Sequence, residues 1–283
     1  MNNNTKGILI TALGVFIMSL ESLFIKLTSV SAFTFSFYLG IFMFVSMFFF
    51  LILKQRDIIR DITKTSFYIF LLSAILMGSA NIFFIWAIKS TTAANVVLII
   101  GTGALFTSLF SYLFYKEKIK INVLIASFFM ILGLLIIFND KLGLGNLKGN
   151  LLALLCTITF SLSFVFMSKY TNINRVALTG MTGISLALIA FFVSDTINID
   201  LYNLGVVALM GLIITPYSRV LIFNGTKFIN ASEVSLLMII ETVMAPVWVW
   251  MVLKEVPSTY TFMGGSIILL TLIANSIYIM KKE

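Results

Sequence analysis

Histidine is absent from this chain of 283 residues, and cysteine occurs once, as Cys156 in an apolar run. A single cysteine permits no disulfide within the chain. Because residues that commonly hold zinc are missing or isolated, and no metal-ligand cluster is visible, we expect no metal and no cofactor. The phosphate-binding loop Gly-x-x-x-x-Gly-Lys-[Ser/Thr] is also missing, which argues against ATP hydrolysis. The chain is therefore not expected to be an enzyme.

Charged residues are scarce, at 11% of the chain, whereas hydrophobic residues make up 60% and the mean hydropathy is +1.10. Soluble globular proteins carry about 25% charged residues, so this balance predicts an integral membrane protein embedded in a lipid bilayer. The 19 basic residues outnumber the 11 acidic ones. Most of them lie in short connections between apolar runs, where they orient membrane spans, and we expect no nucleic-acid partner.

Apolar runs recur along the whole chain, and about 20 residues of helix cross the hydrocarbon core of a bilayer. Open strands cannot satisfy their backbone groups in lipid, so each run is predicted to be a helix. Thr92, and Asn230 together with Glu233, are expected to cap two of these helices. The predicted fold is all-α with ten transmembrane helices, over residues 8–28, 33–53, 67–89, 93–114, 121–138, 149–169, 176–194, 203–225, 231–253 and 258–279.

Lysine and arginine are unevenly divided between the two sets of loops, with thirteen on the side of the N-terminus and four on the other. Because basic residues concentrate in cytoplasmic loops, both termini are predicted to be cytoplasmic. The expected location is a plasma membrane, namely a bacterial inner membrane, which the chain crosses many times. The thirteen are Lys6, Lys54, Arg56, Arg60, Lys64, Lys116, Lys118, Lys120, Lys169, Arg175, Lys227, Lys281 and Lys282, and the four are Lys89, Lys141, Lys148 and Lys254.

The chain repeats itself. Residues 75–133 align without a gap on residues 213–271 at an offset of 138, which brings Lys116-Glu117 onto Lys254-Glu255. The first span aligns on the sixth at an offset of 142, so the first apolar run, too long for a signal peptide, is taken as a span. The predicted units are residues 1–142 and 143–283, each with five spans. An odd number of spans inverts the second copy, and inverted repeats are typical of transporters that bind substrate where the repeats meet.

Several of these patterns resemble one family. They are Gly7, Leu9, Phe24 and Lys26 in the first span, Ala-x-x-Ser-Leu-Leu, Glu-x-x-x-Ala-Pro and Lys-Glu-x-Pro between Ala231 and Pro257, and Tyr115-Lys116-Glu117 after the fourth span. On these residues the chain resembles EamA-type ten-helix members of the drug/metabolite transporter superfamily, along essentially its whole length. The resemblance implies export of amino acids, other metabolites or drugs. Ser108 departs from the pattern, because a proline is expected there opposite Pro246.

Glu241 lies about ten residues into the ninth span, close to the middle of the bilayer. A charge there costs about 2.5 to 3.5 kcal/mol on insertion scales, so the carboxyl must be compensated. It could stay protonated or tie two helices together, or it could bind a substrate ammonium group or a proton. Pro246 disturbs the carbonyl of Thr242 beside it. Interrupted helices border cavities in transporters, and Pro246 is therefore expected to serve as a helix break or gate.

Arg219 lies six residues from the end of the eighth span and can reach deeper. Either it extends its guanidinium to the headgroups, or it pairs with Glu241 or holds a substrate carboxylate. Pro216, one turn earlier, is expected to break the helix and to free the carbonyl of Leu212.

Glu21 lies near the middle of the first span, next to Ser22, and both are assigned to the substrate site. Glu21 and Lys26 are five residues apart and face different directions, so Glu21 needs a partner on another helix. A proton is the simplest partner. Lys26 is expected near the outer end of its span, with its ammonium reaching the interface.

The repeat adds the remaining candidates. At the offset of 138, Asn81 is the counterpart of Arg219, and Gly78 is the counterpart of Pro216. Asn81 is assigned to the substrate site, whereas Gly78 and Ser108 are expected to act as flexible or gating positions. Trp248 shares a face with Glu241 and could either wall the site or serve packing.

These observations lead to a secondary transporter of small metabolites such as amino acids, an exporter that works by alternating access and is coupled to protons. Its partners are then a small-molecule substrate, protons and lipid. An exporter of hydrophobic cations or drugs is the alternative, and a scaffold or sensor that transports nothing comes third. The sequence does not fix the oligomeric state and is compatible with a monomer.

Overall fold

The computed structural model describes residues 3–54, 67–119, 121–139, 147–170, 173–225, 227–229, 234 and 237–280. Every regular element within these residues is a helix, which keeps the backbone hydrogen bonds inside each segment. Eight helical stretches are long and apolar enough to cross a membrane, and two shorter apolar helices follow at 239–253 and 259–275. The ten predicted spans are thus confirmed. The cap proposed for Asn230 and Glu233 lies outside the described residues.

Some spans consist of one helix and others of two or three consecutive pieces. The elements are α1 (Asn3–Met18), α2 (Glu21–Lys26), α3 (Ala32–Lys54), α5 (Phe67–Ser90), α6 (Ala93–Gly101), α7 (Gly103–Tyr115), α8 (Ile121–Phe138), α9 (Leu147–Lys169), α10 (Arg175–Val193), α11 (Leu201–Leu209), the π-helix η1 (Met210–Ile214), α12 (Thr215–Gly225), α14 (Ile239–Leu253) and α15 (Thr259–Met280).

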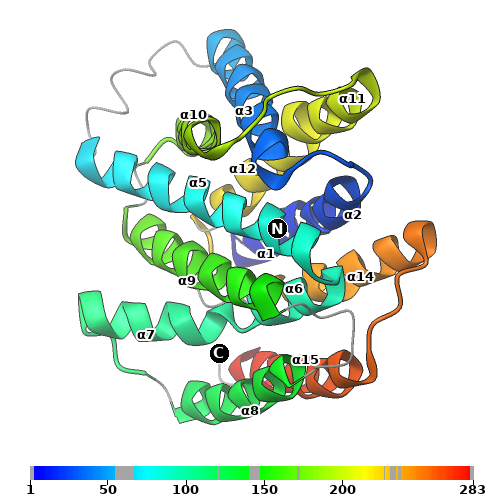
Figure 1. Ribbon diagram of the computed structural model, residues 1–283. Coiled ribbons are helices and arrows are strands. Elements are labelled where there is room, and N and C mark those ends of the chain that lie inside the picture. The colour runs from blue at the N-terminus through cyan, green and yellow to red at the C-terminus, as the bar shows by residue number, and fades with distance from the viewer. Residues whose placement is uncertain are drawn as a thin grey trace.

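The helices pair between the two halves of the chain. α3 packs against α10, α5 against α9, α1 against α12, and α8 against α15. Figure 1 shows α3 and α10 toward one edge of the bundle and α8 and α15 at the opposite edge, with α2, α5 and α9 between them. The contact between the halves therefore runs through the whole bundle. Any motion of one half against the other would have to shift these helix pairs.

Four spans are interrupted within the described residues. The first is broken by a turn at Ser19–Leu20, the fourth at Thr102, the eighth by η1, and the ninth by a turn at Met238. The Thr92 cap is confirmed, since its hydroxyl oxygen accepts the Asn95 N–H at 3.3 Å and starts α6. By contrast, α5 and α9 run without interruption. The breaks are thus confined to particular spans, and all four of these spans carry residues that line an internal cavity, namely Met18, Ile100, Arg219, Met238 and Glu241.

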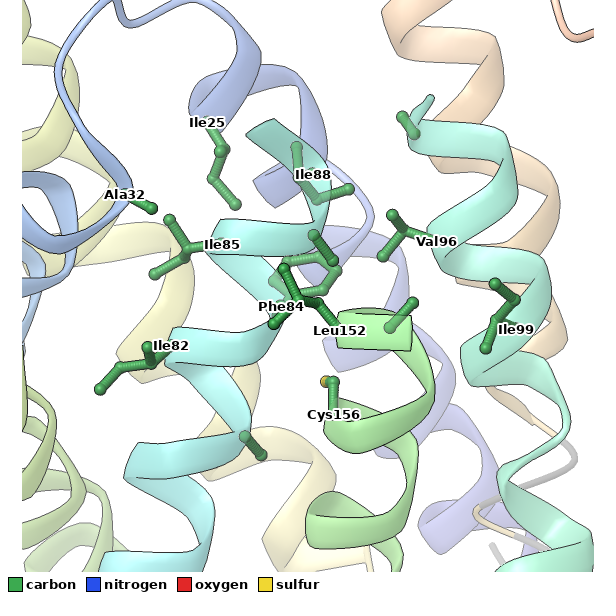
Figure 2. Packing of buried hydrophobic residues seen from close by; sticks show 14 of the residues in the cluster. Ile25, Ala32, Ile82, Phe84, Ile85, Ile88, Val96, Ile99, Leu152 and Cys156 are labelled. Carbon is green, nitrogen blue, oxygen red and sulfur yellow. The ribbon is translucent and has the colours of Figure 1, made fainter. Parts of the chain in front are cut away.

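An apolar cluster fills the space between α2, α5, α6 and α9. In lipid such packing is held by close van der Waals contact, because the surrounding chains are as apolar as the side chains themselves. The cluster continues onto neighbouring helices, and Cys156 is one of its members. Figure 2 shows its members converging from the four helices, including Ile25, Ile85, Ile88, Val96, Ile99, Leu152 and Cys156.

Candidate functional site

A buried ionic centre joins three helices at the middle of the bundle. Arg219 Nη2 of α12 lies 3.4 Å from Glu21 Oε2 of α2 and donates a hydrogen bond of 3.0 Å to Asn81 Oδ1 of α5. The side chains of Arg219 and Glu21 are only 7% and 1% exposed. The Asn81 amide group donates in turn to Met77 O at 3.0 Å, which fixes its orientation. Asn81 and Arg219, counterparts in the repeat, are therefore in direct contact.

This geometry shows where the guanidinium of Arg219 lies and which charged residue it contacts. Its guanidinium does not extend to the headgroups, because the residue is buried. Its charged partner is Glu21, and the predicted pairing with Glu241 is not present. Phe160 of α9 completes the surroundings, with its ring centre 5.7 Å from the guanidinium carbon. A cation above an aromatic face is stabilised by the ring quadrupole, so the guanidinium is held by charge, amide and ring together.

Glu241 is buried as well, at 4% exposure, in the first turn of α14. Within the described part of the chain, no hydrogen bond or ion pair holds its carboxyl group. The N-terminal end of a helix favours negative charge, so the position of Glu241 in the first turn of α14 stabilises its carboxylate. Glu241 thus differs from Glu21, whose charge is already neutralised by Arg219.

A small cavity separates the ionic centre from Glu241. It is lined by both polar and apolar side chains, among them Asn81, Arg219, Glu241, Phe84, Phe160 and Cys156. Its volume is about 20 Å³. Such a space fits about one water molecule, and an organic solute requires far more, so the helices around the cavity must separate before a solute can enter.

Further polar atoms near Glu21 have unused hydrogen-bonding capacity. Glu21 Oε1, the hydroxyl of Ser22 and the hydroxyl of Thr215 are buried and have no hydrogen-bond partner among the described residues. Buried polar atoms in proteins nearly always have partners, so a group of this kind calls for an explanation. Glu21, predicted from the sequence, thus belongs to the buried ionic centre, and Ser22 follows it in α2. Both side chains still have an oxygen that makes no hydrogen bond to the described residues.

A model of the EamA-like transporter family matches the chain twice, over residues 5–139 and 147–277. The chain belongs to the EamA-like transporter family. The two matches start 142 residues apart, at 5 and 147, and end 138 residues apart, at 139 and 277. These are the offsets of the internal repeat. The chain is therefore a multi-pass membrane protein that belongs to a family of transporters, and the family model matches it once in each half.

Its relatives agree with this assignment. The chain is 26% identical over 187 residues to the uncharacterized transporter YdfC of Bacillus subtilis (strain 168), covering 62% of this chain and 60% of that protein. It is also 26% identical over 183 residues to an uncharacterized transporter of Clostridium kluyveri, covering 60% and 59%. The matches thus span about 60% of the length of these curated relatives. One crystal structure of a protein superposes with a TM-score of 0.71 at 16% identity over 99% of both chains, which shows a common fold.

Pro216 lies next to an interruption of its span in this EamA-family chain, as the chemistry of proline predicts. Pro216 has no N–H and so cannot supply the α-helical hydrogen bond to the carbonyl of Leu212. Ser46 of α3 donates a hydrogen bond of 2.6 Å to this oxygen. The break itself precedes the proline, as the π-helix of residues 210–214. Ser46 therefore satisfies the carbonyl that Pro216 has freed, and it was not recognised as important from the sequence.

Replacing Ser46 with alanine is expected to lower the free energy of unfolding by about 1 to 3 kcal/mol, because the Leu212 carbonyl would lose its partner. Thermal unfolding in detergent measures the change. Ser127→Ala is the matched control, since the Ser127 hydroxyl donates only to Val123 O in its own helix. Equal stability of the two variants would show that the freed carbonyl needs no partner.

The helices are not interrupted at the other positions that were expected to break a helix or to act as gates. α5 runs continuously through Gly78, and α7 runs continuously through Ser108, whose hydroxyl donates to Ala104 O at 2.9 Å. α14 likewise continues through Pro246. The fourth span is broken at Thr102 instead, where glycines on both sides lower the stability of a helix. A gating role for these residues remains a prediction.

Trp248 of α14 packs against the first span. Its indole N–H donates to Ser19 Oγ at 3.0 Å, and its ring meets Phe16 edge to face with centres 6.0 Å apart. These contacts favour the packing alternative and hold α14 against the break at Ser19–Leu20. A substrate contact for Trp248 remains a prediction.

Proposed function

We propose that this EamA-family protein exports small metabolites that carry an amino group across a bacterial plasma membrane by alternating access. Amino acids are the first candidates. The main support is the carboxyl of Glu241, which borders the cavity without a partner while Arg219 is already neutralised by Glu21. A buried carboxylate in this position favours a ligand that brings a positive charge. A substrate ammonium or a proton would meet that need.

The guanidinium could bind the other end of the same substrate. Arginine has five N–H donors, and the Nε of Arg219 has no hydrogen-bond partner among the described residues. A carboxylate of the substrate could take this donor while its ammonium faces Glu241. This division of roles suits a zwitterion, and it does not require the Glu21–Arg219 ion pair to break.

Coupling to protons is supported by the same carboxyl group. If Glu241 accepts a proton when no substrate ammonium is bound, protons and substrate compete for one site and exchange across the membrane. A pH gradient imposed on liposomes should then drive accumulation of substrate. Equal rates and equal accumulation with and without the gradient would remove proton coupling from the proposal.

The apolar part of the cavity supports the alternative substrate class. Met18, Phe84, Phe160 and Met238 line it beside Glu241. Aromatic faces and a carboxylate together attract hydrophobic cations. Export of such a cation, with tetraphenylphosphonium as the probe, and no movement of amino acids would favour this class. A protein that acts only as a scaffold or sensor would move neither.

Replacing Glu241 with glutamine is expected to lower transport of labelled amino acids into liposomes by about tenfold or more, since a charge-assisted hydrogen bond to the substrate is lost. The side chain keeps nearly the same volume, so thermal unfolding should change little. Asp195→Asn, at an exposed residue, provides a control for the same chemical change. Wild-type transport by the Glu241 variant would remove this residue from the site.

A further inference from the structure

A second kind of ionic contact lies at the ends of the helices, away from the central site. Lys26 Nζ, at the end of α2, is 2.9 Å from Glu255 Oε2, just after α14. Glu255 Oε1 also accepts the N–H of Ala93 at 2.7 Å, and Lys26 donates to Thr91 O at 2.9 Å. The two charged side chains are 19% and 18% exposed. The pair thus joins α2, α14 and the start of α6 in one network.

The repeat contains a counterpart. Lys169, at the end of α9, pairs with Glu117, just after α7. The side chains of this pair are more exposed, at 39% and 48%. Since α7 repeats α14, Glu117 and Glu255 are counterparts at the offset of 138. Lys169 lies one residue after Ser168, which is the counterpart of Lys26 at the offset of 142. The two ion pairs therefore occupy nearly equivalent positions in the inverted copies. Each pair also joins one repeat to the other.

The backbone before each glutamate supports this equivalence. Lys116 and Lys254 have φ values of 56° and 57°, and they are the two non-glycine residues with positive φ within the described residues. The left-handed conformation costs a residue with a Cβ about 1 to 2 kcal/mol, so the contacts around it must enforce it. In both copies it ends the helix at the lysine and turns the following glutamate toward the other repeat.

The two pairs lie on opposite faces of the membrane. The first and ninth spans both end on the face away from the N-terminus, which holds Lys26 and Glu255. The fourth and sixth spans end on the face of the N-terminus, which holds Glu117 and Lys169. The apolar cluster of Figure 2 lies between the first pair and the cavity, from Ile25 beside Lys26 to Cys156 at the cavity.

We propose that Lys26–Glu255 and Lys169–Glu117 are two latches of one design, which close the path to the cavity on opposite faces and open in turn. The Lys26–Glu255 latch is the tighter one, because it is more buried and has two further backbone hydrogen bonds. When the Lys26–Glu255 pair breaks, α2 separates from α14, and the side chains of the apolar cluster can move apart. The inference rests on the alternating access of the proposed function, although it does not depend on the substrate.

Cys156 supplies a reporter, since it is the only cysteine of the chain and lines the cavity. The full chain in sealed membrane vesicles of known orientation is treated with a membrane-impermeant methanethiosulfonate from one face, and the labelled fraction of Cys156 is measured over time. Glu255→Gln should raise the labelling rate about tenfold from the face away from the N-terminus only. Glu117→Gln should raise it about twofold to fivefold from the face of the N-terminus only, because that pair is exposed.

The controls separate a latch from a general loosening. Lys118→Gln and Asp195→Asn change exposed charges on the two faces and should label like the wild type, and Cys156→Ser gives the background. The double variant Lys169→Glu/Glu117→Lys should return labelling to the wild-type rate. If Glu255→Gln does not fold, Lys26→Gln tests the same latch.

Unchanged labelling in folded variants, or faster labelling from both faces at once, would overturn the proposal. The assay needs no substrate. Face-specific labelling together with no transport of amino acids would therefore reject the proposed substrate and leave the latches standing, whereas normal transport with unchanged labelling would reject the latches alone.

Discussion

Replacing Arg219 with alanine is expected to destabilise the protein by about 3 to 5 kcal/mol and to abolish transport. The guanidinium is the charged partner of the Glu21 carboxylate, which is 1% exposed. Removing one member of a buried pair leaves the other charge uncompensated, which is the costly case, whereas removing both members is often nearly neutral. Asn81 would lose its donor at the same time. Unfolding in detergent, followed by thermal or SDS titration, measures the stability change.

The double variant Glu21→Gln/Arg219→Met isolates the cause of that loss. With both charges gone, most of the lost stability should return, while transport should stay absent because the site has lost its guanidinium. Lys118→Ala, at an exposed lysine, controls for removal of a positive charge as such. A single Arg219→Ala variant as stable as the wild type would show that Glu21 does not need this partner, for instance because it already carries a proton.

The fold was predictable because lipid leaves the chain few choices. Apolar runs of the right length must be helices, and the paired Lys-Glu motifs after the fourth and ninth spans revealed the repeat. The repeat also led to Asn81, a neutral residue that no charge argument would select. The repeat pairs Asn81 with Arg219 but does not require the two to touch. Their contact in the structure indicates that both lie close to the axis that relates the two copies.

The partners of the charged residues were not predictable in the same way. A membrane helix that is apolar around its circumference carries no polar stripe to fix its rotation, so the sequence does not say which helix Glu21 faces. The rotation of each helix about its axis is set by packing against its neighbours. In this fold, Glu21 pairs with Arg219, and Glu241 lines the cavity. The break at Thr102 was missed for a different reason. Proline is the strongest helix breaker, so the sequence favours breaks at positions 216 and 246, although Gly101 and Gly103 flank the residue where the fourth span divides.

Replacing Gly40 with alanine is expected to destabilise the protein by about 1 to 3 kcal/mol or more, through a single added methyl group. α3 and α10 approach most closely where Gly40 faces Gly183. A Cβ atom at position 40 would lie 2.4 Å from the Gly183 carbonyl oxygen and 2.7 Å from the Ala187 backbone nitrogen. These are backbone atoms of a continuous helix, so neither can rotate away, and small residues are what permits such contact between membrane helices.

Gly205→Ala gives the matched control for that change, because nothing lies within 4 Å of an added Cβ in α11. There the same methyl group meets no neighbour and raises helix propensity, so the variant should be more stable by up to about 1 kcal/mol. Thermal unfolding of both variants in the same detergent should therefore show shifts of opposite sign.

The contact between α3 and α10 also joins the two repeats. Gly40→Ala should therefore slow transport even in the protein that remains folded, since α3 and α10 could no longer pack in their present register. A Gly40 variant with the stability and transport rate of the wild type would mean that the α3–α10 contact yields easily and does not hold the repeats together.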